Sequence, residues 1–74
     1  MTKGEYRVGI NFNPSADDMV GKIKRKAADL IDLIETIPVD VEERIRLKAL
    51  AQTHVEDAAM WAVKAATKPS FTNS

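Results

Sequence analysis

The pattern of apolar and polar positions is most informative between Asp40 and Thr67, a stretch of 28 residues that predicts one long helix. Alanine recurs throughout the stretch, and alanine is the residue that most favours a helix. Asp40, with Glu43 three positions later, predicts an acidic cap at the start of the helix. Pro69 disfavours helical geometry at the residue before it, so we expect the helix to end near Thr67 or Lys68.

The apolar side of this predicted helix is unusually broad. A helix that packs on one neighbour shows an apolar stripe a little over ~100° wide, and this one covers roughly twice that. The helix therefore needs more than one packing partner, and we expect copies of the chain to associate. The broad side comprises Leu47, Ala51, Val55, Ala58, Ala59, Ala62, Ala65 and Ala66, flanked by Ile45 and Val63 on one edge and by Leu50, His54 and Trp61 on the other.

An earlier stretch, residues 16–36, predicts a first helix. Its apolar residues alternate spacings of three and four, which is typical of a coiled-coil seam, and Ile31 and Leu33 lie on the two flanks of that seam. A short turn at residues 37–39 would let this helix pack antiparallel against the second. The seam consists of Val20, Ile23, Ala27, Leu30, Ile34 and Ile37.

The first 15 residues form a predicted arm. Tyr6, Val8, Ile10 and Phe12 alternate with other residues, which predicts that part of the arm is extended. At the arm's junction with the first helix, a cap on the helix and a proline at its first position are expected. The candidates are Asn13 or Ser15 for the cap and Pro14 for the first position, with Asp17 and Asp18 complementing the positive end of the helix.

The predicted fold class is therefore all-α. An antiparallel hairpin of two helices, about 16–36 and 41–67, occupies residues 16–68, with the arm at 1–15 and a polar tail at 69–74. Copies of this hairpin are expected to assemble into a homo-oligomeric helical bundle. A chain of 74 residues that cannot cover its own apolar flanks would be only marginally stable alone.

Composition narrows the function classes. The chain has no cysteine, which excludes disulfides and cysteine-based zinc sites. Lysine plus arginine equals aspartate plus glutamate at 11 each, which argues against general electrostatic binding of DNA. No apolar run approaches the ~18 residues of a membrane span, and the first residues do not resemble a signal peptide, so the expected location is the cytoplasm.

One charge cluster runs against helix electrostatics. Lys22, Lys24, Arg25 and Lys26 crowd the start of the first predicted helix, where the helix dipole is positive and cations are unfavourable. Such a cluster indicates an anion site. Carboxylates farther along the same helix leave a second interpretation open, in which these charges only form a solvated face.

Other candidate chemistry is weaker. His54 is the only histidine, and without a second soft ligand it indicates a partly buried structural residue and not a metal site. The acidic residues lack a cleft that would suit them to acid-base catalysis, so no catalytic residue and no cofactor is predicted. Tyr6 and Phe12, aromatic residues beside a basic helix start, are suited either to stack on bases or simply to pack the arm.

Three segments of the chain form a pattern: YR in the arm, DMVGKIK in the first helix and ALAQTHVEDAAMWAVKAATKP in the second. Through these segments, residues 6–69 resemble the phage anti-CBASS and Thoeris anti-defence hairpin-domain family. The resemblance implies a non-enzymatic homohexamer of paired hairpins, in the cytoplasm of the infected bacterium. Such a protein sequesters cyclic dinucleotides, for example cyclic GMP-AMP, and in some members cyclic trinucleotides. An immune effector is thereby left unactivated.

The resemblance also implies a ligand site between subunits. An arm aromatic would stack on a base and a helix lysine would meet a phosphate, which places these roles on Tyr6, with its neighbour Arg7, and on Lys24. Extra residues between arm and helix leave Phe12 as an alternative stacking ring, and Lys22 completes the predicted set. Thr53 and Arg46 are conceivable contacts for a trinucleotide. A competing hypothesis, from the apolar surface alone, is a small helical adaptor that binds a host protein.

Overall fold

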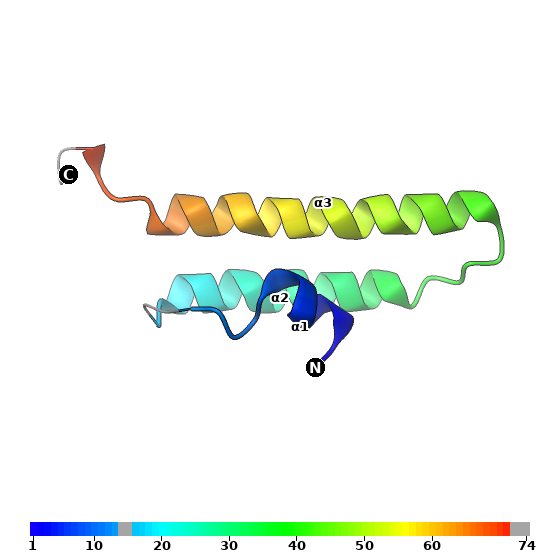
Figure 1. Cartoon of the computed structure of the whole chain (residues 1–74), viewed down its shortest axis with the longest axis horizontal. Coiled ribbons are helices and arrows are strands. Elements are labelled where there is room, and N and C mark those ends of the chain that lie inside the picture. The colour runs from blue at the N-terminus through cyan, green and yellow to red at the C-terminus, as the bar shows by residue number, and fades with distance from the viewer. Residues whose placement is uncertain (14–15, 72–74) are drawn as a thin grey trace.

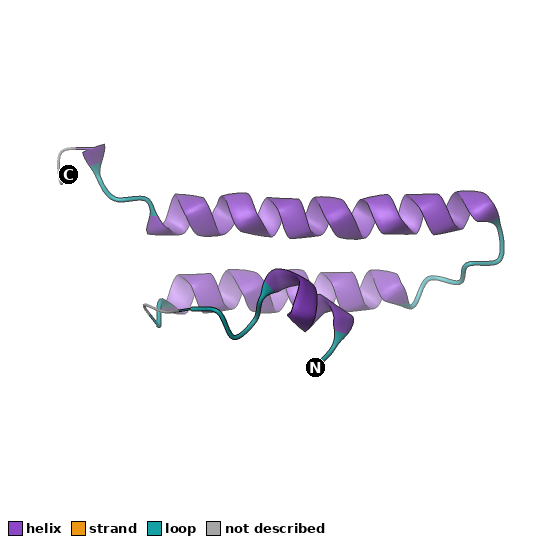
Figure 2. Cartoon of the chain, viewed as in Figure 1, coloured by secondary structure: helices purple, strands orange, loops and turns teal. Residues whose placement is uncertain are grey.

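The computed structural model describes residues 1–13 and 16–71, which form three helices and no strand (Figures 1 and 2). The helices are α1, Lys3–Val8; α2, Asp18–Glu35; and α3, Glu42–Thr67. Helices α2 and α3 lie side by side and antiparallel, and α1 crosses the middle of α2 on one face of the pair (Figure 1). The molecule is a thin slab of 52 × 24 × 12 Å. The predicted all-α hairpin is confirmed.

Helix α2 begins at a different cap from those predicted. The carboxylate of Asp17 accepts hydrogen bonds from the amides of Met19 at 2.9 Å and Val20 at 3.3 Å. Asn13 instead donates to the Asp17 carbonyl at 2.8 Å and accepts from the Asp17 amide at 3.0 Å, so it braces the cap residue. Ser15 and Pro14 lie outside the described residues.

Helix α3 extends over Glu42–Thr67, close to the predicted 41–67 and ending where proline predicts, but its cap was predicted wrongly. Its N-cap residue is Val41, whose side chain cannot accept a hydrogen bond. Asp40 is one residue too early to cap and forms an ion pair with Arg44 at 3.3 Å. The C-terminal end of α2, on the other side of the connection between α2 and α3, does have a side-chain hydrogen bond. The Lys48 ammonium donates to the Glu35 carbonyl at 2.8 Å. That bond satisfies one of the terminal carbonyls of α2.

The arm is helical where an extended segment was predicted. Thr2 and Glu5 form a capping box: the Thr2 hydroxyl accepts from the Glu5 amide at 3.1 Å, and the Glu5 carboxylate accepts from the Thr2 amide at 2.8 Å. Gly9 ends the helix in the left-handed conformation, with φ of 65°, and Ile10 donates back to the Glu5 carbonyl. These signals outweigh the alternation of apolar residues, which belongs to a segment too short to form a sheet.

Six helical residues are not stable alone, so α1 depends on its contact with α2. Gly4 makes that contact. It is buried, and its amide donates to the Asp32 carboxylate at 2.7 Å. A Cβ at this position would overlap the carbonyl oxygen of Ala28, which shows that only glycine lets the two backbones approach this closely. The Asp32 carboxylate also satisfies one of the amides that every helix start leaves unpaired.

The buried face of α2 is displaced from the predicted seam. Val20 belongs to both sets, but Leu30 and Ile37 of the seam are exposed, and Ile31, predicted on the flank, is completely buried. The displacement is caused by α1, because α1 covers one side of α2 in addition to the side that α3 covers. Together these contacts bury Val20, Lys24, Ala28 and Ile31.

The face that α1 does not cover, here called the open side, carries two apolar hollows: one of about 370 Å³ between α2 and α3, and one of about 330 Å³ between α3 and Ile37 in the connection that precedes it. Leu30 and Leu47 line these hollows and are exposed. His54 is also exposed, so the predicted partly buried histidine is wrong. No helix within the described residues is long and apolar enough to span a membrane. The hollows are lined by Ile23, Lys26, Ala27, Leu30, Val55, Ala58, Ala59 and Ala62, and by Ile37, Arg44, Leu47, Lys48 and Ala51.

Candidate functional site

The face covered by α1, here called the arm side, holds most of the polar side chains predicted to bind a ligand. Lys24 is 7% exposed, and its ammonium donates to the carbonyls of Gly9, at 3.0 Å, and Phe12. The same ammonium lies 5.4 Å from the centre of the Phe12 ring, within cation–π range. Lys24 therefore fixes the turn that follows α1. An ammonium has three donors, so one N–H remains for a ligand.

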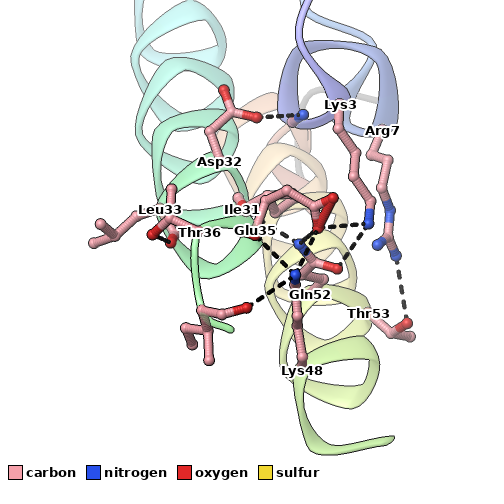
Figure 3. Close-up of polar contacts among 12 residues, drawn as sticks. Lys3, Arg7, Ile31, Asp32, Leu33, Glu35, Thr36, Lys48, Gln52 and Thr53 are labelled. Carbon is pink, nitrogen blue, oxygen red and sulfur yellow. Dashed lines mark hydrogen bonds and ion pairs between the residues drawn. The ribbon is translucent and has the colours of Figure 1, made fainter. Parts of the chain in front are cut away.

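Arg7 projects from α1 toward α3. Its Nε donates to Oε1 of Glu56 at 2.7 Å, and its Nη2 donates to the Thr53 hydroxyl at 3.3 Å (Figure 3 shows the second contact). Both acceptors lie on one side of the guanidinium, which therefore keeps donors on its other edge. Glu56 was not identified from the sequence, because acidic residues are common on the polar side of a helix. Its contact with Arg7 is evident only from the tertiary structure.

Arg7 and Lys24 line one pocket of about 190 Å³ where the three helices meet. The pocket walls are otherwise apolar, apart from the carboxylate of Glu56. A pocket with two cations, one carboxylate and apolar walls is suited to bind an anion that also carries a flat ring. Its lining consists of Arg7, Val8, Lys24, Glu56, Ala59, Met60 and Val63.

The structure does not bring every predicted ligand residue to this pocket. Tyr6 is 77% exposed and lies outside the lining, whereas Phe12, 73% exposed, lies beside it through its contact with Lys24. Lys22 faces solvent and pairs with Asp18 at 3.2 Å. Arg46, the conceivable trinucleotide contact, pairs with Glu43. Thr53, conceived for the same ligand, is instead an acceptor for Arg7.

Arg25, another cation of the predicted cluster, makes structural ion pairs and is not part of the anion site. Arg25 bridges two acids, with distances of 2.8 Å to Glu5 and 2.8 Å to Asp29. The hydrogen bond from Arg25, followed by that from the Thr2 backbone, lowers the pKa of Glu5 from 4.5 to about 2. Arg25 thus ties α1 to α2 and does not face the pocket, so for this residue the cluster is structural.

A polar network around the buried Gln52, which the sequence did not reveal, joins α1 to both long helices. Gln52 is 1% exposed; its amide donates to the Ile31 carbonyl at 3.2 Å and to Glu35 at 3.1 Å, and it accepts from Lys3 at 3.0 Å (Figure 3). Lys3 also pairs with Glu35 at 3.0 Å. The Gln52 bond first, and the Lys3 bond second, lower the pKa of Glu35 from 4.5 to about 2.

Comparisons with known proteins place these features in a family. The family model described as Acb2/Tad1, hairpin domain, matches residues 4–67, which include all of α2 and α3 and nearly all of α1. Comparisons with curated proteins and with solved structures find no match. The family acts in phage anti-defence by sequestering cyclic nucleotides, and its members are binding proteins and not enzymes. Because the match covers most of the chain, this protein belongs to the Acb2/Tad1 hairpin-domain family.

Proposed function

We propose that this chain sequesters cyclic dinucleotides such as cyclic GMP-AMP, leaves them intact, and thereby blocks CBASS effectors in the cytoplasm of an infected bacterium. The observation that carries the proposal is the pocket of about 190 Å³ that brings Arg7 and Lys24 together at the junction of the three helices. Both cations had been predicted as ligand contacts from separate parts of the chain.

The charges of the pocket fit such a ligand. A cyclic dinucleotide carries two phosphates and two bases, so it needs cations beside flat or apolar surfaces. Arg7 is fixed by Glu56 and Thr53 and presents its unused donors, and Lys24 presents its third N–H. Phe12 is the better-placed stacking ring, because it already lies against Lys24, and each stacked base contributes on the order of 1–3 kcal/mol.

The open side supports assembly of several copies. Exposed apolar residues line its two hollows, and a homo-oligomer would bury them. We propose a hexamer. A twofold contact between copies would give each cyclic dinucleotide, itself nearly symmetric, the same set of donors from two protomers. The same binding assays, run with cyclic trinucleotides, test for a second kind of pocket.

The test is recovery of the intact ligand. Purified protein is incubated with cyclic GMP-AMP, separated from free ligand, and heat-denatured, and the supernatant is analysed by chromatography and mass spectrometry. Sequestration predicts release of unmodified ligand. Cleaved product, or no ligand retained before heating, contradicts the proposal.

The adaptor hypothesis rests on the same open side. The molar mass of the purified protein in solution distinguishes it from the proposed homo-oligomer. Light scattering of the purified chain is expected to give a stable homo-oligomer of about six copies. A monomer that associates only with a host protein would instead favour the adaptor.

A further inference from the structure

Glu56 occupies an unusual position for an acid in a pocket meant for an anion. One of its carboxylate oxygens, Oε1, accepts from the Nε of Arg7 at 2.7 Å. The other, Oε2, makes no hydrogen bond with any residue that the structure describes, although the side chain is one third exposed and lines the pocket. A carboxylate repels phosphate, so Glu56 is expected to face a part of the ligand that donates hydrogen bonds.

The donor-rich part of a cyclic dinucleotide is the edge of a guanine base. Guanine presents two adjacent donors, N1–H and the exocyclic amine, beside the acceptor O6. An ionised carboxylate only accepts hydrogen bonds and has about four lone-pair positions, so Glu56 can take both guanine donors while keeping its bond to Arg7. The Nε of Arg7, its donor nearest to Glu56, is already bound to Oε1, so the carboxylate carries the contact with the base.

We infer that Glu56 determines base specificity at this pocket and selects guanine over adenine. This inference rests on the proposed function, because it assigns a preferred base to the ligand of the same site. The carboxylate of Glu56, held in place by its bond from Arg7, presents acceptors along one wall of the pocket, which match the two adjacent donors on the guanine edge. The apolar remainder of the wall, Val8, Ala59 and Val63, suits the faces of the ring.

The other bases match less well. Adenine has one donor on this edge, N6–H, next to the lone pair of N1, so only one contact with the carboxylate forms and the N1 lone pair faces a carboxylate oxygen. Uracil has a single donor between two acceptors. A bidentate contact is worth about 1–3 kcal/mol in discrimination, and a site left with unpaired polar groups penalises the wrong base further. We expect cyclic di-GMP to bind at least about tenfold more tightly than cyclic di-AMP.

The first experiment uses the unmodified protein, so it does not depend on whether a variant folds. Dissociation constants are measured by calorimetry for cyclic di-GMP, cyclic GMP-AMP, cyclic di-AMP and cyclic di-IMP. Hypoxanthine, the base of the last ligand, keeps N1–H and O6 but lacks the exocyclic amine. The expected order of affinity is di-GMP, then GMP-AMP and di-IMP, then di-AMP.

The second experiment uses Glu56→Gln with Glu43→Gln as the matched control. Both substitutions remove one negative charge from α3, but Glu43 pairs with Arg46 and does not line the pocket. The ratio of the di-AMP to the di-GMP dissociation constant is expected to fall from about ten or more toward one in Glu56→Gln, and to stay unchanged in Glu43→Gln. Circular dichroism verifies that both variants keep their helices.

The outcomes separate this inference from the proposed function. Equal affinity of the unmodified protein for di-GMP and di-AMP, or tighter binding of di-AMP, overturns the role of Glu56 and leaves sequestration intact. A preference for di-GMP that survives in Glu56→Gln also overturns it. If none of the four ligands binds, the proposed function fails and this inference fails with it.

Discussion

The two faces of the hairpin are built on opposite principles. On the arm side, α1 covers α2 with a network of specific polar contacts, in which Gly4, Lys24 and Gln52 each satisfy a defined partner. On the open side, the same two long helices expose shallow hollows walled by leucine, isoleucine and alanine. One face is packed by contacts within a single chain, whereas the other leaves apolar side chains exposed in a single chain.

The difference indicates that the two sides have different roles. Polar contacts on the arm side have directions, so they can hold Arg7 and Lys24 at fixed positions around a pocket. Apolar contacts on the open side have no direction but bury area, at roughly 25 cal/mol for each Å² removed from water. We therefore expect substitutions on the open side to change the number of copies, and substitutions on the arm side to change stability and ligand affinity.

The largest expected effect comes from a charge on the open side. Leu30→Glu places a carboxylate in the larger hollow, where a neighbouring copy would bury it, and removing a charge from water costs several kcal/mol even with Lys26 beside it. The oligomer should dissociate to monomers in light scattering, while circular dichroism still reports the helices of the hairpin.

Leu33→Glu is the matched control for that experiment. Leu33 lies on the same helix and is also exposed, but it lines neither hollow. It should leave the oligomer unchanged. If both substitutions dissociate the protein, or neither does, the open side as defined here is not the surface that joins copies.

The next largest effect tests the arm side at its closest contact. Gly4→Ala puts a methyl group into the Ala28 carbonyl and near the Asp32 carboxylate, so α1 must leave α2. A loss of about 2 kcal/mol or more in the free energy of unfolding is expected, as for other overpacked sites. Denaturant titration measures it, and ligand affinity should fall with it because Arg7 moves with α1.

Gly21→Ala provides the comparison for that variant. A Cβ on Gly21 would meet only the Asn13 side chain at 3.8 Å, which is an ordinary contact. Replacing glycine by alanine within a helix stabilises by roughly 0.5–1 kcal/mol. A Gly4→Ala protein as stable as the parent would show that α1 is not held by this contact.

A smaller effect, measured by ligand binding, separates the two lysines of the predicted ligand set. Lys24→Ala removes both the third N–H offered to phosphate and the anchor of the turn at Gly9, whereas Lys22→Ala removes a solvated cation paired with Asp18. Affinity for cyclic di-GMP is expected to fall at least about tenfold for Lys24→Ala and less than about twofold for Lys22→Ala. Equal losses in calorimetry would indicate a general charge effect instead of a built pocket.

The sequence predicted the long elements well, because repeated local signals specify them. The spacing of apolar residues gave α2, and alanine with Pro69 gave the extent of α3. The arm was missed although its signals were present: Thr2 and Glu5 form a capping box and Gly9 a C-terminal stop. Alternating aromatic and aliphatic residues indicated an extended segment. Alternation alone does not show whether the segment has a partner strand to pair with.

The candidate site was predicted only in part, for a different reason. Arg7 and Lys24 were identified through resemblance, but their partners lie far away in the chain: Glu56 follows Arg7 by 49 positions, and Phe12 precedes Lys24 by 12. Gln52 gave no signal at all, because a glutamine on a helix is ordinary until another element buries it. Contacts that depend on how α1 crosses α2 and α3 require the tertiary arrangement.

The smallest expected effect concerns acid, and it distinguishes the faces without any ligand. Glu5 and Glu35 each hold α1, and each has its pKa lowered from 4.5 to about 2 by hydrogen bonds within the folded protein. A carboxylate whose pKa is lowered by folding stabilises the fold at any pH above its ordinary pKa. This contribution is lost as the pH falls from the ordinary pKa to the lowered one, because the unfolded chain takes up the proton first. The contacts of α1 should therefore weaken between about pH 4.5 and pH 2.

The measurement is a pH series of amide chemical shifts. Shifts of α1 should move toward random-coil values across that interval while those of the middle of α3 hold. The double variant Glu5→Gln, Glu35→Gln should lose most of the pH dependence of α1, since a neutral amide does not titrate, whereas Glu43→Gln should keep it. Both acids are partly exposed, so added salt is expected to reduce the effect. If the shifts of α1 and α3 change together as the pH falls, the arm and the hairpin unfold as one cooperative unit. The polar contacts of the arm side would then not form a part of the fold that acid can disrupt by itself.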